Sequence, residues 1–224
     1  YLSWGETKAM PAPACSRSTV SCVIATTALL LCGCGPASDG QGAADANTGP
    51  ATTAAGCPGA FYPEWTSSPY VLPYPVGAAY TVDLSHCSGS YHSAGQPDAY
   101  AIDFDMDIGS VITAARAGLV VYVEESGIDY AFPNNLVVVR HADETFAQYM
   151  HLTTGGALVD IGQQVEQGDQ IGRSGATGLA GYPHLHFVVT QGGWRYPYES
   201  TPTTFSNTQP NERSLASGYR YRAE

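Results

Sequence analysis

The stretch LVVVRHADETFAQYMHL, residues 136–152, carries the clearest signal of fold class. It joins two runs of β-branched and aromatic residues, the second of which covers 145–152, through the polar pair at 143–144, which indicates a hairpin turn. Similar short β signals occur at 119–124 and 184–190, and no segment of helix length shows a helical period. We therefore predict an all-β domain, a compact antiparallel sheet or barrel-sandwich with long loops and no long helix.

The composition fits one folded domain with some additional chain. Of the 224 residues, 44% are hydrophobic and only 13% are charged, so most of the sequence can bury a core. The 9 Lys and Arg residues face 20 Asp and Glu residues, which gives a formal net charge of −11. Because Lys and Arg dominate the contacts with phosphate, this balance argues against nucleic acid or an anionic lipid surface as a partner.

The N-terminal region is typical of a secretory signal followed by a tether. Arg17 precedes an apolar core at 20–31, which is too short to span a membrane, since about 20 residues are needed for that. Gly33-Cys34 then resembles a bacterial lipoprotein box, in which the cysteine is lipidated. The segment that follows lacks bulky apolar residues and is typical of a flexible tether. We predict an upstream extension and signal at 1–34, a tether at 35–56 and one domain at 57–224.

Two cysteines remain for the exported part of the chain. Four of the 6 cysteines lie within 1–34, which leaves Cys57 and Cys87. Two cysteines in an oxidising compartment indicate a disulfide. The alternative is a pair of free thiols or ligands, although neither residue lies in a CxxC motif or a Cys/His cluster.

The sharpest chemical feature is His184-Leu185-His186 inside a predicted strand. Because strand side chains alternate, the two imidazoles share one face, about 6.5 to 7 Å apart at the backbone. One of them can bind a metal while the other reaches a water or substrate beside it. The alternative is a pair of histidines that simply face solvent.

Motifs around this pair extend the pattern over residues 90–190. They are Ala101-Ile102-Asp103-Phe104, Tyr149-Met150-His151-Leu152, the glycine-rich run Gly172 to Gly178, and Pro183-His184-Leu185-His186-Phe187. In this order and spacing the chain resembles the lysostaphin-like, LytM-type zinc metallopeptidases of the cell wall. The resemblance implies the LytM-like duplicated hybrid motif as the fold and Zn²⁺ as the cofactor.

The resemblance also implies which residues bind the metal. The expected ligands are His92, Asp103 and His186, and two imidazoles with one carboxylate form a typical open zinc site. His86 is the alternative to His92, whose spacing to Asp103 exceeds the shortest form of the family motif. Further acidic residues compete with Asp103 or form a solvated acidic rim, namely Asp98, Asp105 and Asp107.

The remaining family histidines, His151 and His184, are expected to act on the water and the developing oxyanion. The sequence has no HExxH glutamate, so a histidine has to take the proton, and we favour His184 while leaving the choice open. His141 is expected to be structural. Val188 stands where many members of this family carry Glu, and we expect this difference to change the contacts that hold the metal ligands in place.

The resemblance implies a secreted zinc endopeptidase that hydrolyses peptide cross-links of bacterial peptidoglycan. We expect a monomer of the cell envelope, attached to the membrane only through the lipid at Cys34. The alternative function is a catalytically silent LytM-type module that binds wall peptides or activates an amidase. A plain extracellular binding domain is a third possibility, but it leaves the histidines unexplained.

Overall fold

The computed structural model of the protein describes residues 55–224. The predicted signal at 1–34 and nearly all of the predicted tether lie outside the described residues. The described part contains one short 3-10 helix, η1 (Trp65–Ser67), and no α-helix, which confirms the all-β prediction. None of its helices could cross a lipid bilayer. The strands are β1 (Ala79–Val82), β2 (Ile102–Asp105), β3 (Val111–Thr113), β4 (Gly118–Glu124), β5 (Leu136–Arg140), β6 (Phe146–Met150), β7 (Leu152–Ala157), β8 (Gln164–Val165), β9 (Gln170–Ser174), β10 (His184–Gln191), β11 (Glu199–Ser200) and β12 (Arg220–Arg222).

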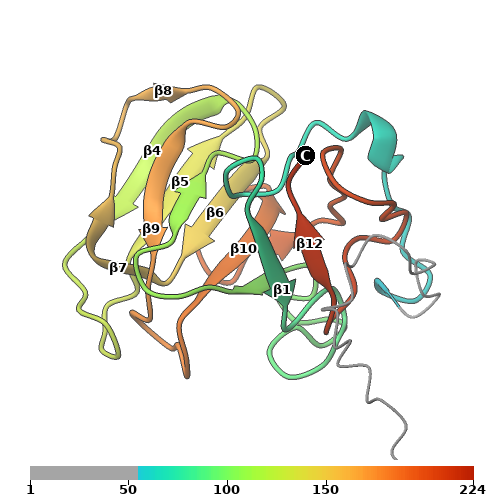
Figure 1. Cartoon of the computed structure of the whole chain (residues 1–224), viewed down its shortest axis with the longest axis horizontal. Coiled ribbons are helices and arrows are strands. Elements are labelled where there is room, and N and C mark those ends of the chain that lie inside the picture. Colours follow the sequence, from blue (N-terminus) through green and yellow to red (C-terminus); the bar gives the residue numbers. More distant parts are fainter. Residues whose placement is uncertain (1–54) are drawn as a thin grey trace, which may run out of the picture. The chain divides into compact units, whose positions relative to one another are not determined.

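The strands form two antiparallel sheets (Figure 1). The large sheet has nine strands in the order β12-β1-β2-β10-β6-β5-β4-β8, with β11 added to β10. The small sheet has three strands in the order β3-β9-β7. The eight-residue strand β10 pairs with β2 on one side and β6 on the other, so it lies in the interior of the large sheet.

The hydrophobic core lies between the two sheets. Ile112, Leu152 and Ile171 contribute to it from the small sheet, and they are fully buried. The large sheet contributes the inward residues of its central strands, including Val137 and Val139 of β5. The central strands β5, β6 and β10 are buried on both faces, so their continuous runs of β-branched and aromatic residues explain why the sequence pattern predicted them. The largest fully buried aromatic side chains from the large sheet are those of Phe104, Tyr149 and Phe187.

The structure corrects the prediction of one continuous strand over 145–152. The strand ends at Met150, and His151 adopts a left-handed backbone conformation with a φ of 63°. The backbone N–H of His151 donates to Asn134 Oδ1 at 2.9 Å, and the next residue already pairs in the small sheet. His151 therefore forms the corner at which the chain passes from one sheet to the other.

The segment at 162–178, in which glycines recur before His184, contains strands as well as turns. Strands β8 and β9 lie within it, and Gly162 and Gly168 occupy turns with positive φ beside them. The predicted hairpin at 143–144 is present, since the N–H of Glu144 donates to the carbonyl of His141 between β5 and β6.

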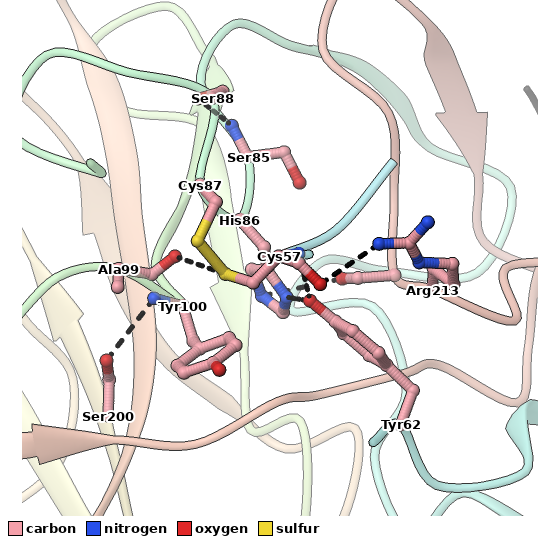
Figure 2. The surroundings of a disulfide bond; sticks show 11 residues. Cys57, Tyr62, Ser85, His86, Cys87, Ser88, Ala99, Tyr100, Ser200 and Arg213 are labelled. Atoms are coloured by element: carbon pink, nitrogen blue, oxygen red, sulfur yellow. Dashed lines mark hydrogen bonds between the residues drawn. A yellow bond between two sulfur atoms is a disulfide. The ribbon is translucent and has the colours of Figure 1, made fainter. Parts of the chain in front are cut away.

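The predicted disulfide between Cys57 and Cys87 is present (Figure 2). It attaches the first described residues to the loop between β1 and β2. Tyr62 and Arg213 hold the same segment, because the Tyr62 hydroxyl accepts from the backbone N–H of Cys57 at 2.9 Å and Arg213 donates to its carbonyl at 3.0 Å. The loop that is fixed in this way carries His92.

Candidate metal centre

Asp103 and His186 occupy paired positions on neighbouring strands of the large sheet. Asp103 lies on β2 and His186 on β10, and the register places their Cα atoms opposite each other. Nδ1 of His186 is 2.8 Å from Asp103 Oδ1. His184, two residues earlier on β10, has its Nε2 3.9 Å from the same oxygen. The two histidines thus share one face of the strand, as alternation predicted.

His92 reaches this pair from the loop between β1 and β2. Its Nε2 lies 3.4 Å from Asp103 Oδ2, and its ring centroid lies 5.2 Å from that of His186. His86 lies elsewhere, with its ring stacked on Tyr62 and its Nδ1 3.2 Å from the tyrosine hydroxyl. The structure therefore brings His92, rather than His86, to the aspartate.

The chemistry of this cluster fits a zinc ion. The potential ligand atoms of His92, Asp103 and His186 all lie within 4.8 Å of one another, and all three residues are buried. Two imidazoles and a carboxylate are the kind of donor set that holds zinc while leaving a coordination position open. Nε2 of His92 faces Asp103 and is therefore the nitrogen better placed to bind a metal. Nδ1 of His92 is buried and has no hydrogen-bond partner among the described residues.

His151 and His184 lie beside this cluster. Together with His186 they form a second group whose potential ligand atoms are within 4.8 Å of one another. Their ring centroids are 4.6 Å apart. His186 belongs to both groups, so an ion held by the first group would lie next to His151 and His184.

Backbone carbonyls orient both of these histidines. Nδ1 of His151 is 2.7 Å from the carbonyl of Thr177, and Nδ1 of His184 is 2.8 Å from that of Tyr182. Since a carbonyl oxygen only accepts, each Nδ1 carries the hydrogen. In the neutral rings, each Nε2 therefore keeps its lone pair and is available to accept a proton.

The electrostatics of the cluster favour a positive charge at its centre. Burial alone would raise the pKa of Asp103, but His186 holds this pKa well below its usual range. Burial lowers the pKa of His186, but the carboxylates of Asp103 and Asp98 outweigh it and raise this pKa to about 10. For His151, burial and the charge of His186 lower the pKa to about 3. A metal cation at this site would replace the proton on His186 as the positive charge beside Asp103.

The cluster opens into a cavity of about 810 Å³. This volume is in the range of sites that bind small-molecule ligands. Leu179 and Tyr196 at its edge are 65% and 70% exposed, so apolar surface borders the cluster on the solvent side. Other lining residues are Tyr91, Asn134, Met150, Tyr182, Trp194, Arg195 and Tyr198.

The rival acidic residues differ in position. Asp105 and Asp107 are exposed, as expected for a solvated rim. Asp98 is not part of such a rim, because its Oδ1 lies 3.3 Å from Nε2 of His186 and accepts a hydrogen bond from the hydroxyl of Tyr198. Sequence analysis missed this contact, since no periodicity or motif relates Asp98 or Tyr198 to His186.

The two remaining residues that the sequence singled out lie in packed surroundings. Val188 is fully buried in a small cluster with Ala101 and Met150. His141 is buried edge-on against Tyr70, and its Nδ1 is 2.9 Å from the carbonyl of Ala117. Among the described residues, His141 belongs to neither group of potential ligands.

Part of the chain is similar in sequence to known proteins named as peptidases. The chain is 36% identical over 87 residues to peptidoglycan DD-endopeptidase ShyA of Vibrio cholerae, which covers 39% of this chain and 19% of that protein. It is 32% identical over 115 residues to lysostaphin of Staphylococcus simulans, covering 51% of this chain and 19% of that protein. The aligned regions thus span about a fifth of the length of these relatives.

Solved structures of similar chains are also found. One is the antimicrobial peptidase lysostaphin from Staphylococcus simulans, with a TM-score of 0.43 and 28% identity, covering 54% of this chain and 47% of that chain. Residues 98–197, which include Asp103 and all three histidines of the second group, match the model of peptidase family M23. The motif resemblance is therefore confirmed over this segment, which matches a domain of peptidase family M23.

Proposed function

We propose that the protein is a zinc-dependent endopeptidase that hydrolyses peptide cross-links of bacterial peptidoglycan. The observation that carries the proposal is the cluster of His92, Asp103 and His186 beside two histidines whose Nδ1 atoms face backbone carbonyls, in a cavity of about 810 Å³. The names of its relatives, a peptidoglycan DD-endopeptidase and lysostaphin, support the substrate class.

In this proposal the histidines divide into ligands and proton-transfer groups. His92, Asp103 and His186 would hold the zinc, which when bound polarises a carbonyl and lowers the pKa of water. His184 accepts the water proton at Nε2, and His151 stabilises the charge that develops on the carbonyl oxygen. The carbonyl of Tyr182 fixes the Nδ1–H of His184 and so leaves its Nε2 lone pair available to accept the proton. His151 holds its Nδ1–H on the carbonyl of Thr177 in the same way, so it can stabilise the charge on the oxygen only when its Nε2 also carries a hydrogen.

The test separates metal content from turnover. The purified full chain is assayed for zinc by mass spectrometry and for muropeptide products released from sacculi. His186→Ala and Asp103→Ala remove ligands, so zinc content and product formation should fall together. His184→Ala and His151→Ala should retain zinc while turnover falls by about 10² to 10⁴, the usual contribution of a positioned acid or base.

Two results would contradict the proposal. If none of the four variants changes zinc content or product formation, the cluster is not a catalytic metal site. If the wild type binds zinc but releases no products from sacculi, the protein is instead a silent module that binds wall peptides or activates an amidase.

We also propose that the protein is exported and anchored through a lipid on Cys34. The proposal depends on the apolar run at 20–31 that ends before Gly33-Cys34, and on the polar tether after it. The Cys57–Cys87 disulfide supports export, because disulfides persist in oxidising compartments.

A further inference from the structure

His186 lies between two carboxylates. Its Nδ1 faces Asp103 at 2.8 Å, and its Nε2 faces Asp98 Oδ1 at 3.3 Å. The two nitrogens of an imidazole point in different directions, so the two acids hold opposite ends of the ring. Asp98 comes from the loop before β2, whereas Asp103 belongs to β2 itself.

The geometry identifies which nitrogen of His186 would bind a metal. Nδ1 points at Asp103, whose other carboxylate oxygen faces His92, so Nδ1 lies on the side of the proposed ligands. A neutral imidazole that binds a metal through Nδ1 carries its hydrogen on Nε2. His186 is only 7% exposed, so this N–H needs a partner within the protein. Asp98 provides the acceptor.

Asp98 is itself held in place. The hydroxyl of Tyr198 donates to Asp98 Oδ1, the same oxygen that faces His186. The aromatic ring of Tyr198 packs against the small cluster that contains Val188. Val188 is the next residue of β10 on the same face as His186, and it is buried and apolar. It therefore offers His186 no polar contact, and the carboxylate has to come from the loop.

We propose that Asp98, oriented by Tyr198, is a positioning residue that accepts the Nε2–H of His186 and thereby aims Nδ1 of His186 at the metal. This inference rests on the proposed function, since it assumes that His186 is a ligand. Asp98 does not ligate the metal itself. Its effect is to fix the tautomer and the angle of the ring and to increase the basicity of the ligating nitrogen.

The expected effect is a loss of zinc affinity. Removal of such an outer partner usually weakens metal binding by about 10- to 100-fold. Asp98→Ala should show this loss in the full chain, measured by competition with a chromogenic chelator. Asp98→Asn should lose less, because its amide oxygen can still accept the Nε2–H. Tyr198→Phe should lose least, since only the orientation of Asp98 is affected.

Asp105→Asn is the matched control for charge. Asp105 is also an acid near the end of β2, but it is exposed and accepts no described hydrogen bond from His186. It should retain the zinc affinity of the wild type. Circular dichroism and thermal unfolding of the metal-free variants establish that each of them is folded.

A second measurement does not depend on affinity. Long-range ¹H–¹⁵N NMR of the zinc-loaded wild type should show His186 with a hydrogen on Nε2 and a metal-bound Nδ1. In Asp98→Ala the Nε2 signal should shift while Nδ1 remains bound. Metal bound at Nε2 of His186 in the wild type would overturn the inference.

The ligand variants separate failure of the inference from failure of the proposed function. If Asp103→Ala and His186→Ala bind zinc as the wild type does, the metal site itself is wrong. If those variants lose zinc but Asp98→Ala binds as tightly as Asp105→Asn, only the positioning role is refuted. If Asp98→Ala loses as much affinity as Asp103→Ala, Asp98 is a direct ligand and the inference is again overturned.

Discussion

Removal of the disulfide between Cys57 and Cys87 should destabilise the protein by about 3.6 kcal/mol. The two residues are 30 positions apart. In the chain-entropy model, a crosslink over a loop of this length lowers the entropy of the unfolded chain by about 12 cal/mol/K, which gives about 3.6 kcal/mol at 25 °C. For a domain of this size the melting temperature should fall by about 7 to 14 °C.

The segment at residue 57 should remain attached in the folded state after the crosslink is removed. Its backbone keeps the hydrogen bonds with Tyr62 and Arg213, at 2.9 and 3.0 Å. The loss should therefore come from the unfolded chain, which becomes more expanded. A larger dependence of the unfolding free energy on denaturant should accompany it.

The measurement is urea unfolding of the Cys57→Ala/Cys87→Ala double variant and of the wild type, both with EDTA so that metal binding does not contribute. Wild type reduced with dithiothreitol is the control, because it lacks the same crosslink but keeps both side chains. The reasoning is refuted if both crosslink-free forms lose less than about 1 kcal/mol. It is also refuted if only the double variant is destabilised, since packing rather than chain entropy would then be responsible.

Three further predictions concern acid stability, backbone packing and export. Burial lowers the pKa of His86 to about 3, whereas the unfolded chain keeps the ordinary value near 6.5. At a pH below 6.5 the unfolded chain therefore binds a proton that the folded protein does not, and the free energy of unfolding decreases as the pH falls. Between pH 7 and pH 5 this loss should be about 2 kcal/mol, and urea titrations of His86→Gln should show a flatter pH dependence; an unchanged slope would contradict this origin. Gly175→Ala should cost about 1 to 3 kcal/mol, because its Cβ would collide with the backbone of Thr153, whereas Gly181→Ala, whose Cβ meets open space, should not; equal melting temperatures of the two would count against the packing. Cys34→Ala should release the protein from the membrane fraction, and mass spectrometry that finds another mature N-terminus without an acyl chain would exclude the anchor.

The features that follow from local periodicity could be predicted from the sequence. Alternation along 184–190 gave both the strand and the shared face of His184 and His186, because strand geometry alone determines which side chains share a face. The pairing of Cys57 with Cys87 followed from counting the cysteines that remain after the signal. These inferences needed no knowledge of how distant segments meet.

The features that depend on loops and on distant contacts could not be predicted. A strand-like run at 145–152 gave no sign that His151 turns the chain, because its positive φ is stabilised by Asn134 from another segment. The contact of Asp98 with His186 joins positions 88 residues apart. The choice of His92 over His86 rested on family resemblance, since the loop between β1 and β2 has no repeating geometry.

The pairing of β2 with β10 has a consequence for how the chain finds its native state. Asp103 faces His186 only when these strands pair in the observed register. A slip by one residue would turn the side chains of one strand to the other face and place Ile102 or Phe104 opposite His186. An ion held by this pair therefore adds its binding free energy to the correct register and to no slipped one. Metal binding would thus stabilise only chains in which β2 and β10 are correctly aligned. Refolding with zinc should therefore give fewer misregistered, aggregation-prone chains than refolding with a chelator.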